Sequence, residues 1–481
     1  MSRRPRTGNR HRRAALTPAA LLLSLAACMT PPDDPPQDHP VTVGELGLSA
    51  RPAPVIADRW WRAYGDPQFD RLVEQALAGN PTLAEALARV RAAQAATSAA
   101  EAGLLPQVGL DGAETRQRFS ANDIYPPPFA GNVYWQGAIK TAFSWNLDFW
   151  GRQAALIAAA RDRVEAARLD VASARLALIG ALAQAYLDLV HAHAVADLAV
   201  QTEAQRQRIL EITGQRVASG LDTEVERRQA DGAVAEARVA REAAENDKAR
   251  AVHQLAALTG AGATAYARIV RPSLKAEAVL PLPATLPADL LARRPDLIAA
   301  RQRIDAALSG RSAAAAAFYP DVNLMGFAGF SAIGLTNLAL GSSLIAGAGP
   351  AIHLPLFDGG ALAAGYRGST ADLDAAVASY NQQVQRAVQD TADRLSEIAA
   401  LGRERDHEQR QLDDAGAAFN LAEARYRAGL AGYLSVLNAE TQLLAARRQH
   451  IDITTAQVMA RIRLLLAVGG SFDPAQSEPK S

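Results

Sequence analysis

The chain has 481 residues, of which 49% are hydrophobic, with 50 basic and 50 acidic side chains and no net charge. This composition excludes a disordered tail and leaves room for several folded segments. The single cysteine, Cys28, excludes an internal disulfide framework.

Residues 1–27 have the pattern of a secretion signal, because six arginines and no acidic residue are followed by the apolar run 14–27. The signal ends in Leu25-Ala26-Ala27-Cys28, which resembles a bacterial lipobox. We therefore expect cleavage before Cys28 and a lipid on its thiol, with ordinary cleavage and a free thiol as the alternative. Met29 stands where an aspartate often signals retention in the inner membrane, which favours the outer membrane. Without the signal the chain has 44 basic and 50 acidic residues, which argues against a nucleic-acid-binding surface.

Residues 28–58 are expected to form a linker. Within it, segment 30–40 contains five prolines and three aspartates, a composition typical of a flexible spacer. A tryptophan-containing motif and a short amphipathic helix at 68–78 follow. Beyond Cys28 no window of eighteen apolar residues occurs, so we expect no transmembrane helix.

A helix at 82–102 is followed by two strands and a very long helix. Residues 107–119 and 133–149 predict a hairpin, and in its second strand the odd positions are mostly apolar and the even positions mostly polar. Residues 152–213 contain no proline and predict a helix of roughly 60 residues and ~90 Å, a length that no compact domain needs. After a turn that contains glycine, residues 223–258 predict a further helix.

The chain is internally duplicated. Short matches recur in the same order at shifts between 208 and 214 residues: Asn80-Pro81 with Arg294-Pro295, Pro106-Gln107-Val108 with Pro320-Asp321-Val322, Phe149 with Phe357, Gly220-Leu221 with Gly429-Leu430, and Leu255 with Leu465. Each half therefore reads as helix, strand, strand, very long helix, turn, helix. The predicted bounds are 59–260 for the first repeat, 261–293 for a connector, 294–470 for the second repeat with strands at 321–330 and 343–357 and a long helix at 360–427, and 471–481 for a tail.

The helix lengths within each half predict one geometry. The short helix before the hairpin and the helix after the turn together nearly equal the long helix. We expect the two shorter helices to stack end to end beside the long one, as a pair of antiparallel rods.

Four strands cannot close a barrel, and an open sheet would leave unpaired edges in a bilayer. Closure needs further copies of the chain: two copies give eight strands, and three give twelve, which is enough to hold a lumen. The side chains expected to face lipid are Val133, Trp135, Ile139, Phe143, Trp145 and Leu147, and those expected to line the lumen are Gln136, Lys140, Ser144, Asn146 and Asp148.

Motifs along nearly the whole mature chain carry a family resemblance. They are the lipobox at Cys28, Trp60-Trp61-x-x-Tyr64-x-Asp66-Pro67, Arg293-Arg294-Pro295-Asp296-Leu297, Phe318-Tyr319-Pro320, Leu356-Phe357-Asp358-Gly359-Gly360 and Arg425-Tyr426-x-x-Gly429-Leu430-x-x-Tyr433-Leu434-x-Val436-Leu437. In these motifs the chain resembles the TolC-like outer membrane factors, in particular the lipoprotein type that serves resistance-nodulation-division efflux pumps.

The resemblance implies a fold that is mainly α with a transmembrane β-barrel. It also implies a homotrimer with a 12-stranded barrel in the outer membrane of a Gram-negative bacterium and a 12-helix tunnel in the periplasm. The connector would lie in the equatorial region of that tunnel. The implied partners are outer membrane lipid, a periplasmic membrane-fusion adaptor and an inner-membrane resistance-nodulation-division pump.

The two helix-turn-helix tips are expected to dock the adaptor and to gate the tunnel, because both repeats place the pattern Arg-x-x-x-Gly-Leu at the end furthest from the barrel. The docking candidates are Arg216, Gly220, Leu221, Arg425, Gly429 and Leu430. The alternative is that the glycines simply cap their helices.

Candidates for the tunnel constriction come from the same tips. Some family members hold acidic residues where this chain has the neutral Ser435 and Asn438, so a carboxylate ring there is in question. Asp222 or Glu224 could substitute for it, although acidic residues are also ordinary in the first turn of a helix. Tyr426, from the matched motif, completes the set.

No motif predicts an enzyme or a cofactor. His191 and His193 lie two residues apart on a helix and therefore on different faces, which argues against a metal site. Walker loops and nucleophile elbows are absent from the sequence. We interpret the chain as a passive exit duct for small molecules such as drugs. The alternatives are a duct for a type I protein secretion system and a periplasmic coiled-coil scaffold or adaptor without a pore, which would lack the alternating strand 133–149.

Overall fold

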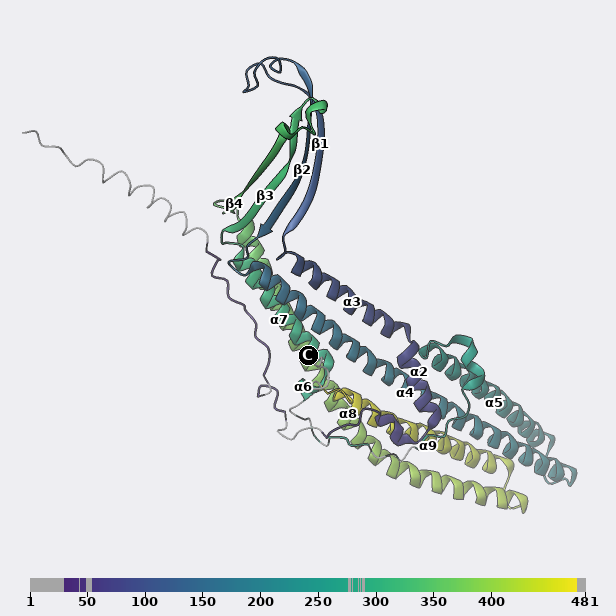
Figure 1. Ribbon diagram of the computed structural model, residues 1–481. Coiled ribbons are helices and arrows are strands. Elements are labelled where there is room, and N and C mark those ends of the chain that lie inside the picture. The colour runs from purple at the N-terminus through teal and green to yellow at the C-terminus, as the bar shows by residue number, and fades with distance from the viewer. Residues whose placement is uncertain are drawn as a thin grey trace, which may run out of the picture. The chain divides into compact units, whose positions relative to one another are not determined.

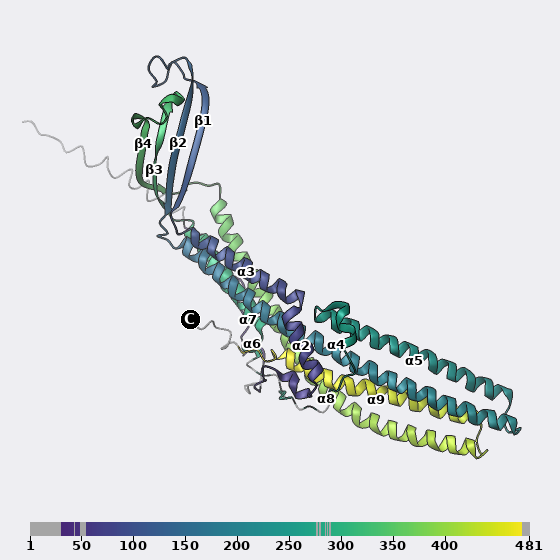
Figure 2. The same cartoon turned by 45° about the vertical axis from the view of Figure 1, so that its right-hand side comes forward.

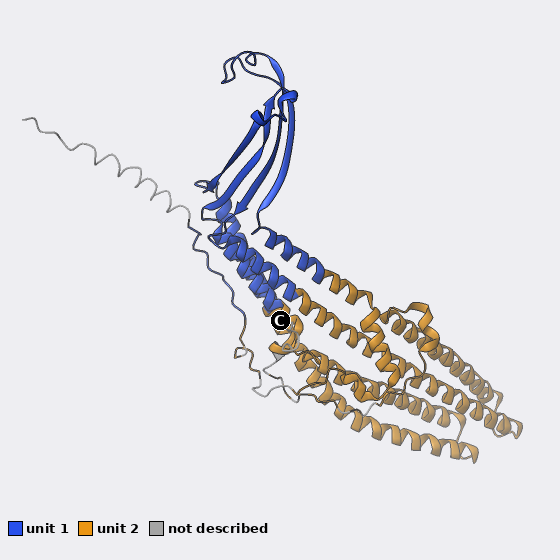
Figure 3. Cartoon of the chain, viewed as in Figure 1, with its two compact units in different colours: residues 1–40, 90–166, 300–380 blue, residues 41–89, 167–299, 381–481 orange. Residues whose placement is uncertain are grey.

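The computed structural model describes residues 30–42, 44–48, 54–275, 278, 280–283, 285, 287 and 290–473. The expected signal segment and Cys28 lie outside the described residues. The chain divides into two compact units (Figure 3). Unit 1 comprises residues 1–40, 90–166 and 300–380, and unit 2 comprises residues 41–89, 167–299 and 381–481.

Unit 1 contains an antiparallel sheet with the strand order β1-β2-β3-β4 (Figure 1). The strands are β1 (Gln107–Arg118), β2 (Val133–Asn146), β3 (Asp321–Ile333) and β4 (Leu344–His353). Pairing between β2 and β3 joins the two predicted hairpins into one sheet, and β1 and β4 each have one edge that no described strand covers.

The register assigns each strand residue to one of two faces, because residues directly opposite one another on antiparallel strands share a face. On one side of the sheet the apolar residues form a band, called here the apolar face, in which Thr141 is the only polar residue. Its members are Val108, Leu110, Gly112, Ile139, Thr141, Phe143, Trp145, Val322, Leu324, Gly326, Ala328, Phe330, Leu344, Ala346, Ala348, Pro350 and Ile352. Beyond this band, toward the loop between β1 and β2, the same side also has Glu114, Arg116 and Arg118. The opposite face, called the polar face, includes Gln107, Asp111, Thr115, Gln136, Lys140, Ser144, Asn146 and Asn323.

The strand ends differ from the prediction: β1 ends one residue early, β3 continues to Ile333 instead of 330, and the largest differences are at the ends of β2 and β4. β2 ends at Asn146, before the predicted end at Phe149. The Leu147 amide still donates to the sheet, but the Asp148 carboxylate then accepts from two amides of the following helix and bends the chain out of the ladder. β4 ends at His353 because Pro355 has no amide hydrogen with which to extend the ladder.

Three pairs of helices have equal lengths, which confirms the internal duplication. They are α3 (Pro81–Ala102) and α7 (Pro295–Ala316) with 22 residues, α4 (Arg152–Ala218) and α8 (Ala361–Arg427) with 67, and α5 (Glu224–Leu258) and α9 (Tyr433–Ala467) with 35. α4 continues past its predicted end at Thr213, because no residue breaks the helix before Gly220. Within the described part of the chain, no helix has an apolar stretch that could cross a membrane.

The chain also has shorter helices, two of which lie before α3 and two within the connector 261–293. They are the 3-10 helices η2 (Trp60–Tyr64) and η3 (Gly262–Arg268) and the α-helices α2 (Pro67–Gly79) and α6 (Leu290–Arg293). The helices α2 and α6 are labelled in Figure 2. Most of α2 matches the short amphipathic helix expected at 68–78.

The predicted end-to-end stacking of the shorter helices is present in both repeats. At the α5–α3 joint, the Asn80 side chain donates to the Leu258 carbonyl at 2.8 Å. At the α9–α7 joint, Arg294 donates to the Ala467 carbonyl at 2.9 Å. A Cβ on Gly260 would lie 2.4 Å from the Gly79 carbonyl oxygen, and glycine is therefore required for so close a joint.

The expectation of a flexible spacer at 30–40 is wrong for the described residues. Within unit 1, the Gln37 and Asp38 amides donate to one carboxylate oxygen of Asp374 at 2.9 and 3.4 Å. Arg311 donates to the Asp34 carbonyl at 3.1 Å. Prolines leave few amides to pair, and those between them find acceptors on α8, so the segment is held against helices.

The main core of unit 2 surrounds the tryptophan-containing motif. Its buried aromatic residues include Trp60, Trp61, Tyr64, Phe69 and Tyr186. Asp66 is only 2% exposed, and it accepts from the Gln68 amide at 2.9 Å, the Tyr186 hydroxyl at 2.6 Å and the Ser273 amide at 2.7 Å. The carboxylate thus joins α2, α4 and the connector.

Candidate functional site at the helix tips

Matching glycine caps end the two long helices in unit 2. Gly220 and Gly429 have φ values of 75° and 78°, in the left-handed region that strains any residue with a side chain. The next amides, of Leu221 and Leu430, donate to the carbonyls five residues earlier at 2.9 and 2.8 Å. The capping role of both glycines is therefore confirmed, and the docking role has to be argued from other residues.

Both turns expose a leucine. Leu221 is 63% exposed and Leu430 is 71% exposed. Arg425 is also exposed. Large apolar side chains presented at the ends of two adjacent hairpins are suited to a contact with another protein.

Arg216 and Asp222 form a hydrogen-bonded ion pair beside the first turn. The Arg216 guanidinium donates to both carboxylate oxygens of Asp222, at 2.8 and 3.1 Å, and through its third nitrogen to the Tyr426 carbonyl at 2.7 Å. The Tyr426 hydroxyl donates to Asp222 at 2.6 Å, and Thr213 lies 2.9 Å from that hydroxyl. These four residues, called here the tip network, connect the α4–α5 hairpin to the end of α8.

The tip network is shielded from water within one chain. The Arg216 and Asp222 side chains are 10% and 7% exposed, and Tyr426 is fully buried. Hydrogen bonds from Arg216 lower the pKa of Asp222, and burial raises the pKa of Tyr426 to about 12. Because the Asp222 pKa is depressed, the stability it contributes is present above its unfolded pKa of about 3.9 and is lost as the pH falls through the lower folded value. The network therefore stays intact between pH 5 and pH 8.

This geometry corrects three expectations. Arg216 is not available as a docking contact, because its guanidinium is buried and occupied. Asp222 does not have a free carboxylate and Tyr426 does not have a free ring with which to line a constriction, because each side chain is buried against the other hairpin of the same chain. The structure brings Arg216, Asp222 and Tyr426 together, but they connect the two hairpins internally and do not form a binding surface.

The other constriction candidates are on the surface of the chain. Glu224 is exposed and pairs with Arg227 at 2.8 Å, while its neighbour Glu226 forms the capping box with Thr223. Glu224 also lies in the first turn of α5, where acidic residues are ordinary, and its place in a constriction stays a prediction. Ser435 and Asn438 are exposed on α9 and remain candidates to face a tunnel.

One buried acid next to the tips was not singled out by the sequence pattern. Glu440 on α9 is 2% exposed, accepts from Gln205 at 2.9 Å and lies 3.5 Å from Arg206. Burial raises its pKa. Its only sequence signal is an acidic residue at a helix position whose neighbours in the heptad are apolar.

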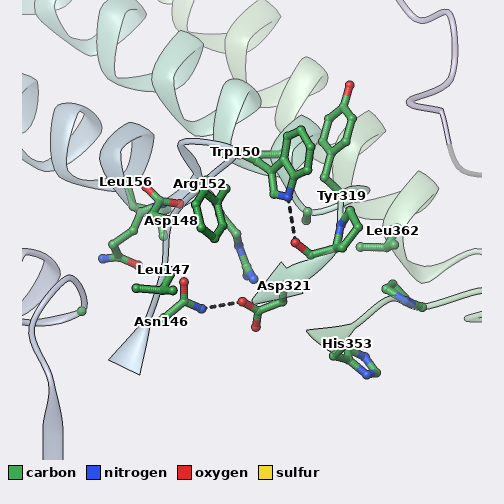
Figure 4. A pocket seen from close by; sticks show the side chains of 17 residues that line it. Asn146, Leu147, Asp148, Trp150, Arg152, Leu156, Tyr319, Asp321, His353 and Leu362 are labelled. Carbon is green, nitrogen blue, oxygen red and sulfur yellow. Dashed lines mark hydrogen bonds between the residues drawn. The ribbon is translucent and has the colours of Figure 1, made fainter. Parts of the chain in front are cut away.

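A hollow in unit 1 lies where the strand ends meet the helices (Figure 4). It has a volume of about 430 Å³ and is lined by the strand ends and the first turn of α4. Trp150 stacks on Tyr319 with ring centroids 4.9 Å apart and donates to the Pro320 carbonyl, and Asn146 donates to Asp321 at 2.6 Å. These contacts fix how the strands lead into the helices.

Three of the six predicted lipid-facing residues belong to the apolar face, and the other three lie outside it. Ile139, Phe143 and Trp145 belong to the apolar face. Val133 and Trp135 lie on the same side of the sheet but outside the apolar face, opposite Arg118 and Arg116. Leu147 lies just outside β2.

Among the described residues, no group of three or more His, Cys, Asp or Glu side chains is placed to hold a metal ion.

Comparison with known proteins gives a family match over most of the chain. Residues 72–261 and 286–470 match the family model described as "Outer membrane efflux protein". The "Multidrug resistance outer membrane protein MdtP" of Shigella flexneri is 31% identical over 425 residues, which are 87% of each chain. The "Outer membrane protein OprJ" of Pseudomonas aeruginosa is 30% identical over 477 residues, which are 97% of this chain and 98% of OprJ.

A solved structure has the same fold. The outer membrane protein VceC of Vibrio cholerae superposes with a TM-score of 0.80 at 31% identity, and the match covers 87% of this chain and all of VceC. All three are named as outer membrane proteins, and MdtP is also named for multidrug resistance.

Proposed function

Since the chain belongs to the outer membrane efflux protein family, we propose that it is the passive exit duct of a tripartite pump and that three copies form the duct. The family match places it in efflux across the outer membrane of a Gram-negative bacterium. The duct performs no reaction and needs no cofactor.

The single observation that carries the trimer is the sheet of unit 1. Its apolar face extends over all four strands, yet both edges are unpaired among the described residues. In a bilayer such edges must be paired, and three copies supply the twelve strands of a barrel that is wide enough for a lumen. The apolar face then meets lipid, and the polar face lines the lumen.

The names of the relatives favour small molecules as the exported class. MdtP carries multidrug resistance in its name, which supports drug efflux over the alternative of protein secretion. The duct would receive its substrates through a periplasmic membrane-fusion adaptor from an inner-membrane resistance-nodulation-division pump. A pore-free adaptor is excluded by the family match.

The barrel proposal predicts opposite outcomes for arginine at two adjacent positions. Phe143 lies in the middle of the apolar face, where an arginine should cost about 2–4 kcal/mol in the membrane. Ser144 lies on the polar face, where water can solvate an arginine. Native mass spectrometry should therefore show trimers for Ser144→Arg and few for Phe143→Arg. Equal trimer yields, or a stable monomer of the parent protein, would contradict the barrel.

The docking proposal rests on the two exposed leucines. Leu221→Asp and Leu430→Asp keep the glycine caps but place charge at the apolar ends of both hairpins. We expect the double variant to insert as trimers, to lose crosslinking to the adaptor and to lose drug export. Val239, which is 70% exposed on α5 and outside the turns, provides the control Val239→Asp. If the double variant exported drugs as well as the parent protein, the docking role would be refuted and the two turns would serve only as helix caps.

The lipobox predicts a lipid on Cys28. Mass spectrometry of the purified protein should show the loss of residues 1–27 and the added mass of acyl chains. Cys28→Ser should reduce anchoring more than channel assembly, because the barrel itself spans the membrane. An unmodified Cys28 thiol in the parent protein is the outcome that would refute lipidation.

A further inference from the structure

The polar face of the sheet contains an apolar hollow. Phe327 and Met325 lie on this face, opposite Ala142 and Ser144, and are 44% and 51% exposed. A depression of about 720 Å³ surrounds them. Its size and its mixture of apolar walls with a few polar groups are those of a small-molecule site.

Glycines form the floor of the hollow. A Cβ on Gly347 would lie 2.9 Å from the Phe327 ring, so glycine is what allows the ring to lie this close to β4. Gly109 and Gly349 also line the hollow, and a Cβ on either would meet nothing within 4 Å. The space above these two glycines is open and can receive a ligand.

One cation borders the hollow. Lys140 lines it, and no hydrogen bond or ion pair holds the Lys140 ammonium among the described residues. Asp111 lies directly opposite Lys140 on β1 but does not line the hollow. A ligand that fills the apolar part would therefore meet a positive charge at the rim, with a negative charge one strand further away.

We propose that this hollow, called the Phe327 hollow, is a transient binding site for small amphiphilic organic anions as they pass the barrel. The apolar part of the anion covers Phe327 and Met325, and its acidic group lies near Lys140. The inference rests on the proposed function, because the polar face must line a lumen for the site to be on the export path. Three copies of the chain would give three such sites at one level of the barrel.

The test is current block of single channels in planar bilayers, with the probe added on the barrel side. The anion 1-anilinonaphthalene-8-sulfonate should block at lower concentration than tetraphenylphosphonium, a cation of similar apolar bulk. Phe327→Ser removes the ring surface that the anion covers. The blocking concentration of the anion should therefore rise about tenfold. Lys140→Gln should raise it about threefold to fivefold at low salt, and this difference should vanish at 1 M salt because screening removes it. Asp111→Asn should lower the blocking concentration of the anion, because it removes the negative charge opposite Lys140.

A matched control keeps the result specific. Ile333 lies on the same face of β3, six residues and therefore ~20 Å from Phe327. Ile333→Ser should leave the block unchanged. Parent channels that conduct but are blocked equally by both ions, or equally before and after Phe327→Ser, would overturn the binding site. A block that Lys140→Gln leaves unchanged at low salt would overturn the preference for anions. A chain that forms no conducting channel would instead refute the proposed function.

Discussion

Arg216→Met is expected to open the tunnel end of the channel. The change removes the guanidinium that binds Asp222 at 2.8 and 3.1 Å and holds the Tyr426 carbonyl at 2.7 Å. Asp222 would then be a buried carboxylate with only the Tyr426 hydroxyl as its partner. Breaking a buried pair from one side costs about 3–5 kcal/mol, and we expect the lower end of this range because the network lies near the end of the bundle. The two hairpins should separate, and single-channel conductance in planar bilayers should rise several-fold.

The second repeat provides a matched control. Arg425 occupies the equivalent position in the pattern Arg-x-x-x-Gly-Leu but is exposed. Arg425→Met should therefore leave the conductance unchanged. The double variant Arg216→Met with Asp222→Leu removes both charges and should be less destabilised than Arg216→Met alone. If Arg216→Met and Arg425→Met channels conduct alike, the tip network does not hold the tunnel closed.

The sequence did contain the signal that distinguishes these two arginines. Six residues after Arg216 stands Asp222, whereas six residues after Arg425 stands Ala431. The pattern Arg-x-x-x-Gly-Leu that the repeats share ends one residue before this difference. The contact itself also needs Tyr426, which is 204 residues from Asp222 and is brought beside it only by the packing of the hairpins.

The long helices and the apolar face could be predicted because their patterns are local and periodic. The absence of proline over 152–213 is enough for a helix, and alternation over 133–149 is enough for a two-faced strand. The ends of these elements depend on single contacts. Asp148 ends β2 by capping α4, and the alternation of apolar residues passes through that position without a break.

The proline-rich segment shows why composition can mislead. Prolines and aspartates at 30–40 are typical of a spacer, because such a segment has little apolar surface to bury. The segment is instead held by Asp374, which accepts hydrogen bonds from two amides of the segment, and by Arg311, which donates to one of its carbonyls. Partners more than 270 residues away leave no trace in the local pattern.

Asp66→Leu is expected to destabilise the protein strongly. The carboxylate accepts from the Gln68 amide, the Tyr186 hydroxyl and the Ser273 amide, and it is only 2% exposed. Leucine would fill much of the volume but would leave three donors without an acceptor, of which the Gln68 amide and the Tyr186 hydroxyl belong to buried residues. Each buried donor without a partner costs about 1–3 kcal/mol, so the loss should be at least ~2 kcal/mol. In thermal unfolding of the detergent-solubilised protein, followed by tryptophan fluorescence, we expect the Tm to fall by about 2–5 °C.

Asp70, one turn further along α2, separates this effect from a general intolerance of the helix. One of its carboxylate oxygens is buried without a hydrogen bond, and burial raises the pKa of the group. A raised pKa means that the charged form is disfavoured in the fold, so the penalty is present at neutral pH and disappears as the pH falls through the folded value. Asp70→Asn removes that charge and should leave the Tm unchanged or higher. If Asp66→Leu lowers the Tm no more than Asp70→Asn does, the carboxylate of Asp66 does not hold α2, α4 and the connector together.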